Sequence, residues 1–206
     1  MTPEQERKAV HRVRAGDADA FEALVRAHEK TVYNIALRML GNPQDAEDAA
    51  QDAFLKAYRS IDALQDSDRF SVWLYRIVSN VCLDQLRARK RRQETSVTVE
   101  NDEGELEELE LPDERFSPAH LLDRKLTREA VQRGLNALND EARNILLLRE
   151  IRGLSYEEIG QALNLEPGTV KSRLFRSRKK LCEILLQDGN ISDLISSAPL
   201  KGGETP

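Results

Sequence analysis

The sequence is poor in the residues that build disulfide scaffolds, metal sites and membrane spans. It holds two cysteines, Cys82 and Cys182, and three histidines, all far apart along 206 residues. Because none of them has the spacing of a zinc site or a C-x-x-C pair, we expect two reduced core thiols and no metal. The longest apolar run, Ile145 to Leu148, is far too short to cross a bilayer, so no membrane insertion is expected.

The marks of a secreted protein and of an enzyme are also missing. The first residues are polar and charged, which excludes a secretory signal and predicts a cytoplasmic protein. The sequence contains no catalytic triad pattern, no phosphate-binding loop and no cluster of metal ligands. We therefore expect neither a catalytic site nor a cofactor.

Glycine and aromatic residues are scarce, while good helix formers are plentiful. There are 10 glycines and 5% aromatics, and leucine, alanine, arginine and glutamate dominate. This composition predicts an all-α fold. We expect two small helical domains, residues 1–92 and 117–187, joined by a flexible acidic linker, 93–116, and followed by an unstructured tail, 188–206.

The charge is unevenly distributed along the chain. The net charge of -5 argues against a simple DNA-coating protein. Two basic blocks, Arg87 to Arg92 and Lys171 to Lys180, flank an acidic run from Glu100 to Glu114. This pattern indicates two nucleic-acid-facing surfaces joined by an acidic connector.

Helical periodicity and capping signals divide each domain into four helices. In the first domain we expect a helix over 4–15 and a longer one that begins at a capping box of Asp19 and Glu22 and ends at Gly41. A third helix follows an Asn42 cap and covers 43–61, and a fourth covers 69–91. In the second domain we expect helices over 118–138, 140–153 and 167–186. Between the last two, a helix begins at Ser155, where Glu158 completes a capping box, and ends at Asn164.

The last two helices have the pattern of a helix-turn-helix. On a helical wheel, one face of the final helix is directed inward: Val170, Leu174, Ser177 and Leu181. The opposite face collects Ser172, Phe175, Arg176 and Lys179. A phenylalanine within a basic outer face suits a major groove, where it can touch a thymine methyl while cations reach guanine or phosphates. An ordinary helical hairpin with a charged outer face is the alternative.

The helix over 43–61 carries Asp45, Asp48 and Asp52 on one face. Carboxylates at this spacing repel each other, which a basic protein partner would relieve. A solvated acidic face near a helix N-terminus, where aspartate is favoured, explains the array as well.

The following helix mixes aromatic and cationic residues near its start. Phe70, Trp73 and Tyr75 stand among Arg69 and Arg76, a combination that suits unpaired bases and their phosphates. Phe70 and Trp73 fit a helical core equally well. Tyr75 lies off the apolar stripe, so we expect it at the surface.

Three segments together resemble the sigma-70 family of polymerase specificity factors, in its extracytoplasmic-function (ECF) group. They are Asp45–Tyr58, Phe70–Asn80 and Leu154–Leu181. The resemblance implies a sigma factor that directs core RNA polymerase to promoters in a stress or envelope response. The first segment would dock on the clamp of the largest polymerase subunit. The residues implied in core binding are Asp48, Ala49, Gln51, Asp52, Phe54, Leu55, Tyr58 and Ile61.

The resemblance also implies two sets of promoter-binding residues. Those for the −10 element are Arg69, Trp73, Tyr75, Arg76, Asn80 and Arg87, with Asn80 binding a base flipped out of the duplex. Those for the −35 element are Tyr156, Glu157, Thr169, Lys171, Ser172, Arg173, Phe175, Arg176 and Lys179. Further implied partners are the polymerase flap region and an anti-sigma factor that can hold the chain at a membrane. No obligatory homo-oligomer is expected.

Two rival functions are compatible with the residues alone. A stand-alone helix-turn-helix regulator would bind an operator without polymerase, as a dimer on paired half-sites. A helical adaptor that binds only proteins would tolerate loss of Arg173 and Arg176.

Overall fold

The computed structural model describes residues 1–95 and 118–187, with side chains given for 1–92 and 127–187. Regular structure in these ranges is helical, without strands, in agreement with the predicted all-α class. None of the described helices has the length and apolarity of a membrane span, and the described residues hold no cluster suited to a metal ion. Most of the predicted acidic linker and all of the predicted tail lie outside the described residues.

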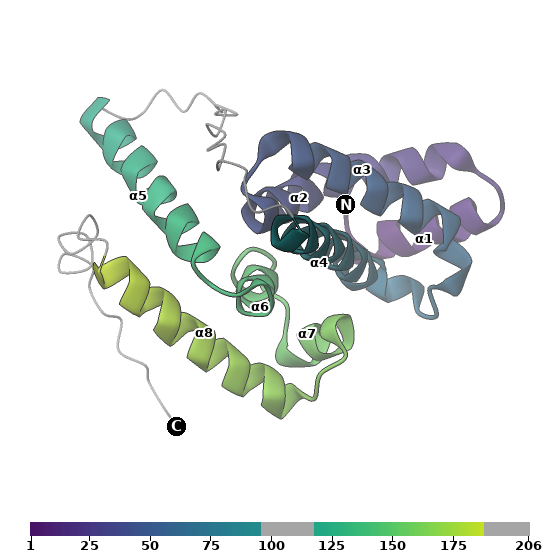
Figure 1. Ribbon diagram of the computed structural model, residues 1–206. Coiled ribbons are helices and arrows are strands. Elements are labelled where there is room, and N and C mark those ends of the chain that lie inside the picture. Colours follow the sequence, from purple (N-terminus) through teal and green to yellow (C-terminus); the bar gives the residue numbers. More distant parts are fainter. Residues whose placement is uncertain (96–117, 188–206) are drawn as a thin grey trace.

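The N-terminal half is a helical bundle in which the long helix α2 (Ala18–Leu40) is central (Figure 1). Its elements are α1 (Pro3–Arg14), α2 (Ala18–Leu40), α3 (Pro43–Arg59), two 3₁₀ turns, η1 (Ile61–Ala63) and η2 (Ser67–Arg69), and α4 (Phe70–Thr95). Helix α2 packs against α1, α3 and α4, so the apolar stripes of all four meet at its sides.

Local capping explains where these helices begin. The Asn42 side chain accepts a hydrogen bond from the Asp45 backbone N–H at 3.1 Å, and Pro43 takes the first helical position, as predicted. The expected start of α2 at Asp19 is wrong. Asp17 is the cap and accepts from Ala20 N–H at 3.2 Å, because its extended backbone directs the carboxylate over the first turn.

The C-terminal half contains α5 (Pro118–Asn136), α6 (Asp140–Glu150), α7 (Tyr156–Leu163) and α8 (Pro167–Gln187). The predicted capping box of Ser155 and Glu158 opens α7, and Asn164 ends it in the left-handed conformation at φ 54°. Gly160 lies within α7, and a Cβ added to it would lie 2.5 Å from the Leu165 carbonyl oxygen in the turn that follows. Only glycine allows this close approach, so Gly160 lets the turn between α7 and α8 pack tightly on α7.

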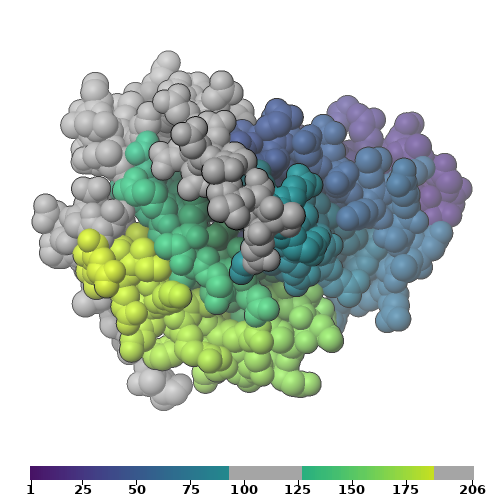
Figure 2. All heavy atoms as spheres, in the orientation of Figure 1, coloured from purple at the N-terminus to yellow at the C-terminus, as the bar shows by residue number. Residues whose placement is uncertain are grey.

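The two bundles pack directly against each other, with α6 and α7 lying on α2 and α4 (Figure 1). In the space-filling view the teal atoms of α4 border the green atoms of the C-terminal helices (Figure 2). At this contact the Ser79 hydroxyl donates to Asn144 Oδ1 at 2.9 Å, and both residues are buried. The Arg152 guanidinium also donates to the Thr31 hydroxyl at 3.1 Å. Polar groups therefore occupy the buried contact between the bundles.

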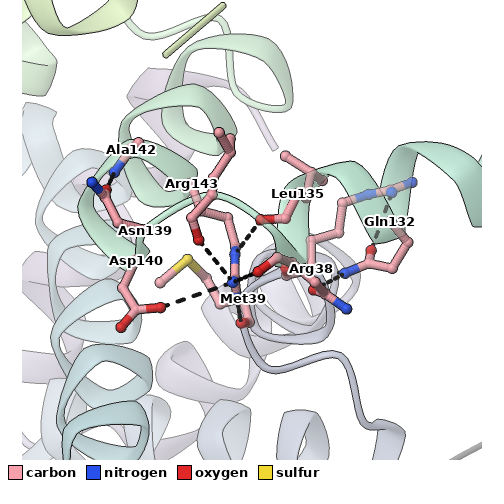
Figure 3. A network of polar contacts seen from close by, with 10 residues as sticks. Arg38, Met39, Gln132, Leu135, Asn139, Asp140, Ala142 and Arg143 are labelled. Carbon is pink, nitrogen blue, oxygen red and sulfur yellow. Dashed lines mark hydrogen bonds and ion pairs between the residues drawn. The ribbon is translucent and has the colours of Figure 1, made fainter. Parts of the chain in front are cut away.

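Arg143 lies at the centre of a polar network at this contact (Figure 3). Its guanidinium donates to the carbonyls of Leu135, at 2.8 Å, and Asn136, at 3.0 Å, and also to the carbonyl of Met39 at the end of α2. Burial lowers the pKa of Arg143 below its ordinary value, and the nearby Asp140 carboxylate opposes that shift. One buried cation thus joins the α5–α6 turn to the N-terminal bundle.

The two cysteines differ in their surroundings. Cys82 is buried in the N-terminal core, and burial raises the pKa of its thiol to about 12, so it stays protonated at neutral pH. Cys182 is exposed on α8, so the expectation of two core thiols is wrong for this residue.

Candidate polymerase and nucleic-acid interfaces

Helix α3 presents a mixed acidic and apolar surface. The exposed members of the predicted core-binding set, spaced so that they share one side of the helix, are Asp48, Gln51, Asp52, Leu55 and Tyr58. Leu55 and Tyr58 are among the few large apolar side chains that the described part of the protein leaves exposed. A small apolar patch bordered by carboxylates is typical of a protein-docking surface. We call these five residues the α3 surface.

Three other residues of the predicted core-binding set contribute less to this surface. Ala49 and Ile61 are buried in the core, and Phe54 is half-buried. Their side chains fix α3 against the bundle instead of facing a partner. Asp45, at the start of the acidic array, is paired with Arg89 of α4, so it lies apart from the α3 surface.

A hollow of about 430 Å³ lies between the end of α3 and the middle of α4. It is lined by Lys56, Arg59, Ser60, Ile77, Asn80 and Val81. Asn80 is exposed at this hollow, so its amide is available to a ligand. The hollow therefore combines an apolar wall, an amide and two cations.

The structure corrects the expectation of a surface position for Tyr75, which is 0% exposed. Its hydroxyl lies 3.0 Å from His28 Nδ1, and the Arg152 guanidinium carbon lies 4.5 Å from its ring centroid. Burial raises the pKa of Tyr75 to about 12, although the positive charge of Arg152 opposes the shift. His28 of α2 and Arg152 of the second bundle both lie against Tyr75, which is why a wheel drawn for α4 alone misplaces it.

Trp73 is also part of the core. It is 9% exposed, and its ring lies 6.1 Å from that of Phe70, which is completely buried. In this arrangement neither Trp73 nor Tyr75 offers a ring face for stacking on a base. The sequence left open whether Phe70 and Trp73 contact bases or pack in the core, and in the structure both pack in the core.

The remaining residues predicted for the −10 element are exposed along α4 and the turn before it. Arg69 lies 3.2 Å from Asp66 and donates to Gln161 of α7. Arg87 lies 3.3 Å from Asp84, while Arg76 is exposed on the same helix. Arg76, Asn80 and Arg87 recur at helical spacing, so they lie along one side of α4.

Helix α8 presents the outward face that the wheel predicts. Phe175 is 69% exposed, and the residues exposed around it are Lys171, Ser172, Arg176 and Lys179. The predicted inward face is buried at Val170, Leu174 and Ser177, and Leu181 is half-buried. The expected amphipathic arrangement of this helix is confirmed.

Several residues of the predicted −35 set are held by neighbours. Arg173 donates to Glu141 of α6 at 2.9 Å, and Thr169 accepts from the Ser172 hydroxyl through its carbonyl at 3.0 Å. On α7, Tyr156 is half-buried beneath the Arg149 guanidinium, and Glu157 is exposed in the first turn. Contacts with α6 therefore fix the orientation of α8 at one side of its exposed face.

Some residues at these surfaces were not singled out from the sequence. Phe21 of α2 packs against Tyr58, with ring centroids 4.9 Å apart, and so supports the α3 surface. Lys56, Arg59 and Ser60 line the hollow at Asn80. Ile77, one turn before Asn80, is the member that helical spacing alone could have indicated.

Comparison with known proteins agrees with this geometry. The family model described as sigma-70 region 2 matches residues 24–92, and the one described as sigma-70, region 4 matches residues 128–181. The chain is 35% identical to the ECF RNA polymerase sigma factor SigW of Bacillus subtilis (strain 168), over 85% of this chain and 94% of that protein.

Two solved structures have a similar fold. CnrH, in complex with the cytosolic domain of CnrY, has a TM-score of 0.64 and 28% identity, covering 89% of this chain and 99% of that chain. The sigma factor RpoE of Bartonella quintana, in complex with the anti-sigma factor NepR, has a TM-score of 0.61 and 25% identity, covering 80% and 96%. With two family models in order and a relative matched over most of its length, the chain belongs to the sigma-70 family as an ECF RNA polymerase sigma factor, a transcription initiation factor and not an enzyme.

Proposed function

We propose that this sigma factor reads the −35 element through α8, binds an unstacked base of the −10 element beside Asn80, and docks on core polymerase through the α3 surface. The observation that carries the proposal is the exposed Phe175 on the basic face of α8, within a helix-turn-helix. Leaving a large aromatic ring in water has no benefit for a solvated helix, whereas a major groove gives it an apolar partner.

In the proposed complex α8 lies in the major groove. Phe175 contacts a thymine methyl, Arg176 reaches guanine acceptors, and Lys171 and Lys179 neutralise phosphates. The ion pair of Arg173 with Glu141, at 2.9 Å, holds that arginine beside the groove before DNA arrives. A preset orientation reduces the entropy lost on binding.

The hollow at Asn80 suits a single base. Its volume of about 430 Å³ accommodates one base with water, and Ile77 supplies an apolar wall. The Asn80 amide can donate to and accept from a base edge, as required for a base removed from the stack. Lys56 and Arg59 can neutralise the adjoining phosphates.

The proposed protein partners are core polymerase and an anti-sigma factor. The clamp of the largest subunit is the proposed partner of the α3 surface, and the flap region that of the C-terminal bundle. Both solved neighbours are bound to another protein, CnrY in one and the anti-sigma factor NepR in the other. These complexes support a comparable anti-sigma partner for this chain. The proposed protein is cytoplasmic and needs no homo-oligomer to function.

Simultaneous reading of both elements requires the two bundles to separate. The elements lie about 25 base pairs apart, which corresponds to ~85 Å of duplex. A compact chain of this size has a radius of gyration of only about 17 Å. The buried polar contacts Ser79–Asn144 and Arg152–Thr31 can be exchanged for water, so we propose that the bundles come apart on the polymerase.

A comparison of DNA binding with and without polymerase tests this function against the rival of a stand-alone regulator. The free protein is expected to retain promoter duplex poorly, because its net charge is -5. Addition of core polymerase should produce a specific, footprinted complex. Tight sequence-specific binding by the purified protein alone, measured by mobility shift at physiological salt, would contradict the proposal.

The α3 surface can be tested with Asp48→Lys combined with Asp52→Lys. We expect core affinity to fall by about 10- to 100-fold, because reversed charges at a complementary interface repel the partner. Titration of labelled protein with core polymerase gives this affinity.

The matched control is Asp19→Lys with Glu29→Lys, which makes the same charge change at exposed carboxylates of α2, outside α3. It should leave the affinity within about twofold. Equal affinities for both double variants would refute this assignment.

A further inference from the structure

Arg14, the last residue of α1, reaches a distant turn of the chain. Its Nε and Nη2 donate to the Ile61 carbonyl at 3.3 and 3.0 Å, and Nη2 also donates to the Leu64 carbonyl. The two carbonyls belong to one turn, η1 and its C-terminal cap. A planar guanidinium can hold both at once, which a lysine ammonium cannot do with the same geometry.

This turn has buried anchors and an exposed tip. The side chains of Ile61 and Leu64 are buried, while Asp62 and Ala63 between them are exposed. The Ile61 carbonyl also accepts from the Leu64 N–H at 3.2 Å, so Arg14 adds to the bond that closes the turn. The backbone of the turn is therefore fixed at both anchors by the same side chain.

The turn continues directly from the wall of the hollow at Asn80. Ser60, which lines the hollow, precedes Ile61, and the Ser60 hydroxyl donates to the Lys56 carbonyl at 2.6 Å. A shift of Ile61 would therefore move Ser60 and change the shape of the hollow. No residue of α1 lines this hollow, but Arg14 of α1 holds the turn that directly follows Ser60 in its wall.

We propose that Arg14 is a positioning residue for selection of the −10 base: by holding the Ile61 and Leu64 carbonyls, it fixes the rim of the hollow beside Asn80. This inference rests on the proposed function of that hollow. Arg14 lies outside the segment that matches sigma-70 region 2, residues 24–92. Through Arg14 the first helix takes part in base selection without touching the base.

The test compares Arg14→Ala and Arg14→Lys with the wild-type protein in run-off transcription with core polymerase. Templates are a promoter selected from genomic fragments and its single-base variants in the −10 element. The readout is the ratio of initiation on the selected promoter to initiation on each variant. Misfolding lowers both rates together and leaves the ratio unchanged, so the ratio isolates base selection.

We expect Arg14→Ala to reduce this discrimination ratio by about tenfold, because two carbonyls lose a charged donor. Arg14→Lys should also reduce it, since an ammonium lacks the fork. Discrimination among −35 variants and affinity for core polymerase should stay within about twofold.

Arg7→Ala is the matched control. Arg7 also reaches from α1 to the same loop, but its contact is an exposed ion pair with Asp68 at 3.6 Å and involves no backbone carbonyl. We expect it to leave the ratio unchanged. The inference is overturned if Arg14→Ala keeps the wild-type ratio, or if Arg7→Ala reduces it equally. Absence of transcription with the wild-type protein would instead refute the proposed function.

Discussion

Replacing Phe175 or Arg176 with alanine is expected to reduce promoter-specific transcription severely while core binding survives. Both side chains are exposed on the outer face of α8, so their loss should leave the helix folded. Each lost base contact costs about 1–3 kcal/mol, or roughly 5- to 150-fold in promoter affinity. Run-off transcription on the selected promoter measures the loss, and co-purification with core polymerase measures the retained binding.

Arg128→Ala provides the control for this prediction. Arg128 is an exposed arginine of the same bundle on α5, away from the outer face of α8. Its removal should change transcription by about twofold at most. Unchanged transcription by the Phe175 and Arg176 variants would favour an adaptor that binds only proteins. Parallel loss of transcription and core binding would indicate misfolding instead of a role in reading DNA.

Arg143→Ala should lower the free energy of unfolding by about 3 kcal/mol. The guanidinium donates to the carbonyls of Leu135, Asn136 and Met39, and the substitution removes these donors at a buried position. Urea denaturation followed by far-UV circular dichroism measures the change.

Arg176→Ala, an exposed arginine of the same bundle, serves as the stability control and should change the free energy of unfolding by less than about 0.5 kcal/mol. A decrease below 1 kcal/mol for Arg143→Ala would contradict the role of Arg143 as the polar centre of the contact between the bundles. Because one of its bonds ends on Met39 in α2, the variant should also loosen that contact.

Much of the fold follows from local signals in the sequence. Asn42 with Pro43, Ser155 with Glu158, and Asn164 each act on backbone groups within one turn of themselves. Such signals do not depend on the rest of the protein, so the helix ends they define agree with the structure. The two faces of α8 were also predictable, because α8 is covered on one side only.

Features created by contact between distant segments were not predictable in this way. Tyr75 lies off the apolar stripe of α4 and is nevertheless buried, because His28 of α2 and Arg152 of the other bundle both lie against it. Arg143 and Asn144 are polar residues, yet both are buried, because Met39 and Ser79 of the other bundle are hydrogen-bond partners for them. The hollow at Asn80 likewise arises from the way α3 meets α4.

The residues proposed to read the promoter are only partly specified by sequence. Phe175 and Asn80 are exposed where a ligand can reach them, as expected from the wheel and from the family resemblance. Trp73 belongs to the core, and Ala49 contributes packing and not a contact surface. Resemblance identifies the segment proposed to bind, whereas burial decides which of its side chains are available to a ligand.

Run-off transcription from a genomic fragment library is the most direct measurement of this account. With core polymerase alone we expect no specific transcripts, and with the protein added we expect discrete transcripts whose start sites share two upstream elements. Their common sequence would define the bases opposite α8 and the Asn80 hollow. If core polymerase and this protein together initiate at no fragment, the proposed role in promoter recognition is wrong.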